Sequence, residues 1–142
     1  MPKKRIILSW LPALVFMGVL FYCSSIPGDK IHLPDFRFSD KVAHFFAYSC
    51  LGWLLTLRKV LRGSLGSKLE SGKPIVAEQR RSKDMLGQVV GILYGVSDEF
   101  HQIFVPLRDA SVFDWSADAL GVCAGSWLCR KMFAAARRIN AG

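Results

Sequence analysis

The sequence predicts an all-α protein: a small polytopic membrane bundle of four transmembrane helices with both termini in the cytoplasm. Three observations predict this fold. The chain has 142 residues, of which 51% are hydrophobic and only 21% charged, and this length suits a single domain covering residues 1–142. Its apolar residues gather in four long runs. Its Lys and Arg residues are concentrated in three of the segments that flank these runs.

The four apolar runs are long enough to be membrane helices. A bilayer core about 30 Å thick needs roughly 20 helical residues, with about 17 to 25 the usual range. A soluble four-helix bundle is the alternative, but each of its helices would need polar residues every three or four positions. The first run contains only Ser9 as a polar residue. We therefore expect transmembrane spans at residues 6–23, 41–57, 85–105 and 112–129.

The positive charges predict how these spans are oriented. Three Lys or Arg residues precede the first span, eight lie in segment 58–84 and four follow residue 129, whereas the remaining segments together carry four. Cytoplasmic segments of membrane proteins carry an excess of Lys and Arg. We therefore expect both termini and a flexible basic loop at 58–84, with helical ends, to be cytoplasmic. Topology and anionic lipid headgroups then account for the net charge of +8, and no nucleic-acid partner is predicted.

The second span begins with polar residues that share one face. Asp40, His44 and Tyr48 follow one another at intervals of four, which places them in a row along a helix. Asp40 is also suited to capping the helix N-terminus, and Lys41 follows it directly. This pattern predicts that Asp40 orients His44 at the outer end of the span.

The third and fourth spans bring further polar residues to the same outer end. Asp98 and Gln102 share a helix face, while Glu99 points about 100° away from them. After a short turn, Asp114 and Asp118 again lie four residues apart. We expect all five side chains to meet those of the second span.

These groups include five carboxylates but few cations, namely Lys41, Arg108 and, when protonated, His44. An ionised group inside hydrocarbon costs several kcal/mol, so such residues usually face the bundle interior and pair. Two interpretations remain open. The groups form either a hydrogen-bonded core that holds the helices in register, or a functional cleft where shifted pKa values, a cation or water compensates the acids.

Glycines spaced four residues apart indicate closely packed helices. They form one stripe in the third span and another in the fourth, and we expect these two spans to pack together and bring Glu99 near Asp118. The same stripes also allow a homodimer, although contact within one chain is favoured. The stripes consist of Gly87, Gly91 and Gly95, and of Gly121 and Gly125.

Three ordered motifs resemble the VanZ-like family of integral membrane proteins. Segment 39–52 contains Asp-Lys-x-x-His followed by Tyr and Leu-Gly, segment 98–108 contains Asp-Glu-x-x-Gln and later Pro-x-Arg, and segment 114–121 contains Asp-x-x-x-Asp-x-x-Gly. The family usually has Gly where Leu107 stands and Asn where Asp118 stands. We therefore expect another backbone shape in the outer turn. An ionised Asp cannot donate a hydrogen bond as Asn does, so we expect Asp118 to be protonated or to contact Arg108.

The resemblance implies a multi-pass protein of the bacterial cytoplasmic (inner) membrane, in a family whose namesake raises resistance to the glycopeptide teicoplanin. The expected partners are membrane lipids and a cell-wall precursor or lipoglycopeptide. In the first functional hypothesis, a polar outer-leaflet cleft binds a lipid headgroup, a cell-wall precursor or a glycopeptide-related ligand. The candidate ligand-binding residues are Asp40, Lys41, His44, Tyr48, Asp98, Glu99, Gln102, Arg108, Asp114 and Asp118.

The alternative is a membrane enzyme that applies acid–base chemistry to a lipid-linked phosphate. Its candidate catalytic residues are Asp40, His44 and Glu99, with Arg108 holding the phosphate. No cofactor is predicted. A divalent ion held by those three candidates is a minor variant, because the chain lacks the short ligand spacings of known metal motifs. Ion conduction is disfavoured, since the polar residues all lie on one side.

Overall fold

The computed structural model describes residues 8–31, 38–67 and 77–139. These ranges contain four α-helices and one short 3-10 helix, η1 (Gly28–Lys30), and no strand, which confirms the all-α prediction. The α-helices are α2 (Leu11–Ser24), α3 (Ser39–Ser67), α4 (Ala77–Gln102) and α5 (Val112–Ile139).

The helices differ from the predicted spans mainly at the basic end. α3 continues to Ser67 and α4 begins at Ala77, so both ends of the basic segment 58–84 are helical, as expected. α5 continues to Ile139, well beyond residue 129. The apolar runs underestimated these helices because backbone hydrogen bonding does not require apolar side chains. Over the described ranges, none of the helices has both the length and the continuous apolar character that a membrane crossing demands.

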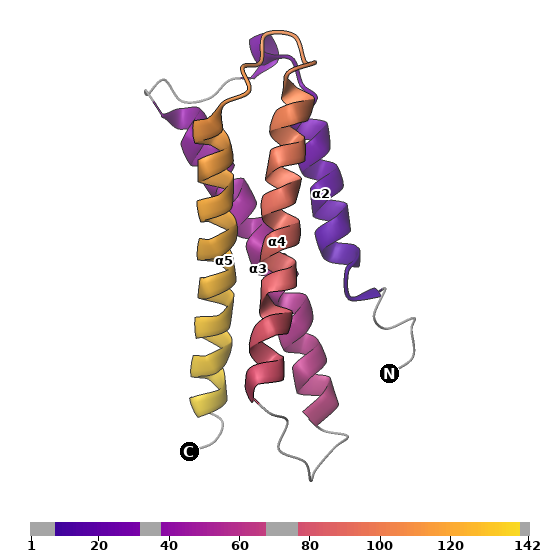
Figure 1. Cartoon of the computed structure of the whole chain (residues 1–142), viewed down its shortest axis with the longest axis vertical. Coiled ribbons are helices and arrows are strands. Elements are labelled where there is room, and N and C mark those ends of the chain that lie inside the picture. Colours follow the sequence, from indigo (N-terminus) through magenta and orange to yellow (C-terminus); the bar gives the residue numbers. More distant parts are fainter. Residues whose placement is uncertain (1–7, 32–37, 68–76, 140–142) are drawn as a thin grey trace.

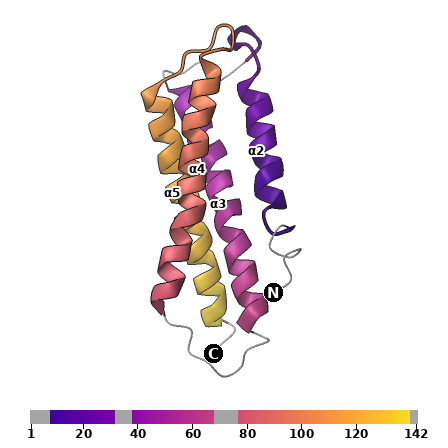
Figure 2. The same cartoon turned by 45° about the vertical axis from the view of Figure 1, so that its right-hand side comes forward.

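Helices α3, α4 and α5 pack side by side, and α2 lies along this group (Figures 1 and 2). The 103–111 turn and η1 lie together at one end, which we call the turn end. The start of α2, the end of α3, the start of α4 and the end of α5 all lie toward the opposite end. The Arg58 guanidinium carbon stacks 3.5 Å above the ring centre of Trp10 and links α3 to α2.

The closest helix contact is between α3 and α5. A Cβ atom at Gly121 or Gly125 would collide with the backbone of Phe45 or Ser49 in α3. Gly52 of α3 meets the backbone of α5 in the same way. The expectation that the 121 and 125 glycines would pack against α4 is therefore wrong: their partner is α3. Small residues permit this approach because nothing separates the two backbones.

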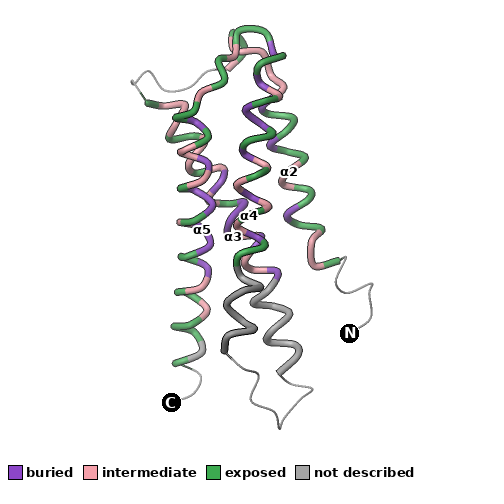
Figure 3. Tube along the Cα trace, in the orientation of Figure 1, coloured by how far each residue is buried: buried purple, intermediate pink, exposed green. Residues whose placement is uncertain are grey.

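The glycine stripe of α4 faces the other two helices. A Cβ at Gly91 would lie 3.0 Å from the Val122 side chain and 3.1 Å from Leu55 Cδ1. At Gly95 it would lie 3.2 Å from Asp118 Oδ2 and 3.4 Å from Tyr48 Cε1. The stripe therefore makes its contacts within one chain. Figure 3 shows the buried residues following the facing sides of these helices.

The turn that joins α4 to α5 contains a strained leucine. Leu107 has a φ of 58°, in the left-handed region that glycine adopts without penalty. The amide of Gly28 donates to the carbonyl of Pro106 over 3.2 Å, which joins η1 to this turn. A leucine therefore occupies a backbone conformation suited to glycine, and the expectation of another backbone shape in this turn stays a prediction.

Candidate polar site at the turn end

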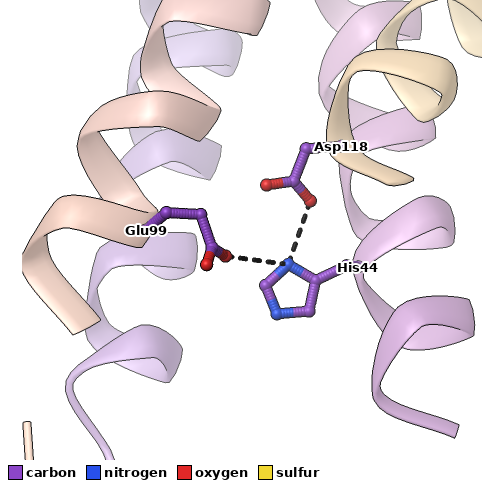
Figure 4. A group of neighbouring side chains, drawn as sticks. All are labelled: His44, Glu99 and Asp118. Atoms are coloured by element: carbon purple, nitrogen blue, oxygen red, sulfur yellow. Dashed lines mark hydrogen bonds and ion pairs between the residues drawn. The ribbon is translucent and has the colours of Figure 1, made fainter. Parts of the chain in front are cut away.

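Side chains from three helices meet near the turn end, as predicted. His44 of α3 lies between Glu99 of α4 and Asp118 of α5 (Figure 4). His44 Nδ1 is 2.9 Å from Asp118 Oδ1 and 3.8 Å from Glu99 Oε1. Glu99 is 7% exposed and Asp118 is fully buried at 0%. The prediction that Glu99 and Asp118 come close together is correct, although His44 stands between them.

The partner of His44 is not the residue that local spacing indicated. Asp40 instead contacts Lys41, with 2.8 Å between Oδ2 and Nζ, and 45% of its side chain is exposed. The prediction that Asp40 orients His44 is therefore wrong, because Asp118 occupies Nδ1 from across the α3–α5 contact. The His44 and Tyr48 rings do share a face, lying nearly parallel with their centres 6.3 Å apart.

Lys41 neutralises carboxylates from two helices. Its Nζ lies 2.8 Å from Asp40 and 3.1 Å from Asp114 Oδ1, so it joins the first turns of α3 and α5. Partial burial opposes the ionisation of Asp40. The hydrogen bond and the charge of Lys41 outweigh this effect and hold the pKa of the Asp40 carboxyl below its ordinary value.

Glu99 is held in place by the start of α5. The backbone amide of Ser111 donates to Glu99 Oε2 over 2.8 Å. The Ser111 hydroxyl in turn accepts a bond from the amide of Phe113 at 3.2 Å, as an N-cap residue does. Glu99 is thus fixed through one oxygen, while its other oxygen, Oε1, is turned toward His44 (Figure 4).

Asp98 and Gln102 lie on the same face of α4, as predicted. The amide nitrogen of Gln102 donates to Asp98 Oδ2 over a long 3.5 Å. Both residues are buried, as are Tyr48 and Asp114. Together with the three residues of Figure 4 they form what we call the polar cluster: His44, Tyr48, Asp98, Glu99, Gln102, Asp114 and Asp118.

Arg108 makes a different contact from the one predicted. Its Nη2 donates to the carbonyl of Cys23 at the end of α2, over 3.3 Å. The expected contact between Arg108 and Asp118 is therefore replaced by the ion pair of Asp118 with His44. As a result, this guanidinium fastens the turn to α2, and the charge of the polar cluster is dominated by its carboxylates.

His101 makes a contact that the local patterns did not predict. Its Nε2 lies 3.0 Å from the Ser25 hydroxyl, and its ring stacks on Phe21 with centres 4.5 Å apart. This contact links the end of α2 to α4. The sequence feature that could have pointed to His101 is its position within the motif at 98–102, between Glu99 and Gln102.

The arrangement is suited to proton transfer and to binding groups that donate hydrogen bonds. Asp118 fixes one ring nitrogen of His44, and the other, Nε2, points away from both carboxylates in Figure 4. A histidine held in this way presents Nε2 as a base or an acid. Four buried carboxylates in the cluster supply acceptor oxygens for hydroxyl or ammonium groups.

Comparison with known protein families identifies the family to which the chain belongs. The model of the VanZ/LLP1 family matches residues 9–134, which include every residue of the polar cluster. Searches of curated proteins and of solved structures found no match. Because the family model covers most of the sequence, this chain belongs to the VanZ/LLP1 family.

Proposed function

We propose that this VanZ/LLP1-family protein is a multi-pass protein of the bacterial cytoplasmic membrane whose polar cluster binds a lipid-linked headgroup from the outer side. The observation that carries this proposal is the inverted placement of side chains. Four acids and one amide from α4 and α5 are buried at the turn end beside Tyr48 of α3, while large apolar side chains are exposed along the helices. Ionisable residues inside membrane proteins usually face the bundle interior and mark functional sites.

The exposed apolar side chains support contact with lipid. They occur on every α-helix and are between 36% and 80% exposed on α3, α4 and α5. Soluble monomers rarely expose contiguous apolar patches of more than a few hundred Å². Examples are Leu14 and Val15 on α2, Phe46 on α3, Leu93 and Phe100 on α4, and Leu120 and Trp127 on α5.

The charge of the polar cluster limits which chemical groups of a ligand it can bind. Lys41 is shared between Asp40 and Asp114, and Arg108 donates through Nη2 to a backbone carbonyl, so these two cations beside the cluster already have partners of their own. The carboxylates favour the part of a headgroup that donates hydrogen bonds, such as sugar hydroxyls or an amine. A lipid, a lipid-linked cell-wall precursor or a lipoglycopeptide carries such groups.

Mass spectrometry of lipids that copurify with the protein tests this proposal. We expect a glycosylated or amine-bearing lipid with the wild-type protein, and at least a tenfold lower amount with Asp98→Asn or Glu99→Gln. Asp29→Asn is the matched control, because Asp29 is an exposed carboxylate of η1 at the same end. Identical lipid profiles in all variants would contradict the proposal.

Reporter fusions test the membrane topology separately. Fusions after residue 142 and within the basic segment 58–84 are expected to report a cytoplasmic position, and a fusion in the 103–111 turn an external one. A cytoplasmic signal from the turn would refute an outer-side site. In that case, the lipid measurement would still show whether the polar cluster binds a ligand from the inner side.

Acid–base catalysis on a lipid-linked phosphate is the second candidate. The Asp118–His44 pair favours it, since a carboxylate on Nδ1 supports proton transfer at Nε2. Incubation with vesicles that contain phosphatidylglycerol, followed by mass spectrometry, would reveal turnover. Positioned acid–base groups contribute about 10²- to 10⁴-fold, so we expect His44→Gln to slow any turnover by at least 100-fold. Equal rates with wild type would exclude this role of His44.

A further inference from the structure

We propose that His44, Glu99 and Asp118 form a binding site for a divalent first-row transition-metal ion. Each residue comes from a different helix, and one donor atom from each lies within 4.8 Å of the other two. Nothing in the proposed headgroup binding requires this ion, so the inference stands independently of it.

Buried carboxylate oxygens without hydrogen-bond partners indicate that these residues can bind a cation. Glu99 Oε1 and Asp118 Oδ2 are both inaccessible to solvent and accept no hydrogen bond from the described residues. Their residues are more than nine-tenths buried. An isolated buried carboxylate is strongly disfavoured unless it is paired or coordinates a metal. His44 Nδ1 carries at most one proton, which cannot satisfy both carboxylates.

The distances suit a metal ion after a small closure. Metal–nitrogen and metal–oxygen bonds of about 2.0–2.2 Å place neighbouring ligand atoms roughly 3 Å apart. His44 Nδ1 already lies 2.9 Å from Asp118 Oδ1, and Glu99 Oε1 lies 3.8 Å from the same nitrogen. Glu99 would need to move closer to His44 and Asp118, since the three donor atoms now lie within 4.8 Å of one another. A bound metal ion would replace the proton that lies between His44 Nδ1 and Asp118 Oδ1.

The surroundings hold these ligands in position. The Ser111 amide fixes the second oxygen of Glu99, and conserved partners of this kind orient ligands in metal sites. Gly95 lets Asp118 approach α4, since a Cβ there would lie 3.1 Å from Asp118 Cβ. An imidazole with two carboxylates suits Mn²⁺, Fe²⁺ or Zn²⁺ better than Ca²⁺, which prefers oxygen ligands alone.

Mn²⁺ binding to purified, chelator-treated protein in detergent tests the inference. Mn²⁺ is a better probe than Zn²⁺, because soft thiolates bind Zn²⁺ and the chain has four free cysteines. We expect calorimetry to give one site per chain, and Asp118→Asn and Glu99→Gln each to weaken Mn²⁺ binding by about 100-fold or more. Asp29→Asn, a control on an exposed carboxylate outside the site, should leave the affinity within about threefold.

Spectroscopy on the wild-type protein covers the case in which a variant does not fold. Pulsed electron paramagnetic resonance of bound Mn²⁺ should reveal coupling to one imidazole nitrogen, and His44→Gln should abolish that coupling. Circular dichroism before metal addition identifies variants that have lost their helices. Absence of saturable Mn²⁺ binding to the wild type, absence of nitrogen coupling, or unchanged binding in both folded carboxylate variants would each overturn the site.

Discussion

Replacing Gly125 by alanine should break the contact that brings the polar cluster together. A Cβ at this position would overlap the Ser49 carbonyl and lie 3.0 Å from Ser49 Cα. These atoms belong to the α3 backbone and cannot turn aside, so α3 and α5 must move apart. Overpacking costs about 1–3 kcal/mol, and closely packed backbones cannot relax by changing rotamers. The higher helix propensity of alanine returns up to about 1 kcal/mol.

We therefore expect Gly125→Ala to lower the free energy of unfolding by about 2 kcal/mol. The matched control is Gly18→Ala in α2, where no atom lies within 4 Å of the added Cβ. There only helix propensity acts, and stability should rise by up to about 1 kcal/mol. Both variants replace Gly by Ala, yet their free energies of unfolding should change in opposite directions and differ by about 3 kcal/mol.

Thermal unfolding in detergent, followed by circular dichroism, measures both variants. A change of 1 kcal/mol shifts Tm by roughly 3–4 °C for a chain of this size, so the two melting temperatures should differ by about 10 °C. Gly125→Ala should also weaken Mn²⁺ binding, because His44 and Asp118 lie on the separated helices. Equal melting temperatures for the two variants would refute the close approach of α3 and α5.

Substitutions at three further positions each test a single feature. Leu107→Gly should raise stability by up to about 1 kcal/mol, because it removes the strain of a left-handed leucine whose side chain is 77% exposed; a clear fall in Tm would contradict this. Asp118→Asn keeps an acceptor for His44 and should cost less than about 1.5 kcal/mol, whereas Asp118→Ala should cost about 3 kcal/mol; equal losses would show that the hydrogen bond contributes nothing. Tyr94→Phe removes the bond of 2.6 Å to the Met17 carbonyl and should cost about 1 kcal/mol, with faster hydrogen exchange in α2; unchanged exchange would contradict this anchoring role.

Local patterns in the sequence predicted the helices and the end at which the polar residues gather. Asp98 and Gln102 share a face of α4, and His44 and Tyr48 share a face of α3, because a helix repeats every 3.6 residues. The apolar runs alone stop short of the helix ends at 58–67 and 77–84, since the polar helical residues there leave no apolar run to detect.

The pairing of side chains across helices could not be obtained in this way. Local spacing favoured Asp40 as the partner of His44, yet the partner is Asp118, 74 residues away in the sequence. The glycines at 121 and 125 indicated a close contact without indicating with which helix. Their contact with Phe45 and Ser49 brings α5 against α3 and places Asp118 beside His44.

The amino-acid sequence by itself determined the helical class, the family and the polar end of the molecule, because these follow from composition, spacing and ordered motifs within single segments. Only the tertiary structure decided which helices touch, and hence that a histidine is enclosed by two carboxylates from different helices. The physical reason is that helical periodicity orders side chains around one axis. The rotation and distance between two axes depend on how their surfaces pack together.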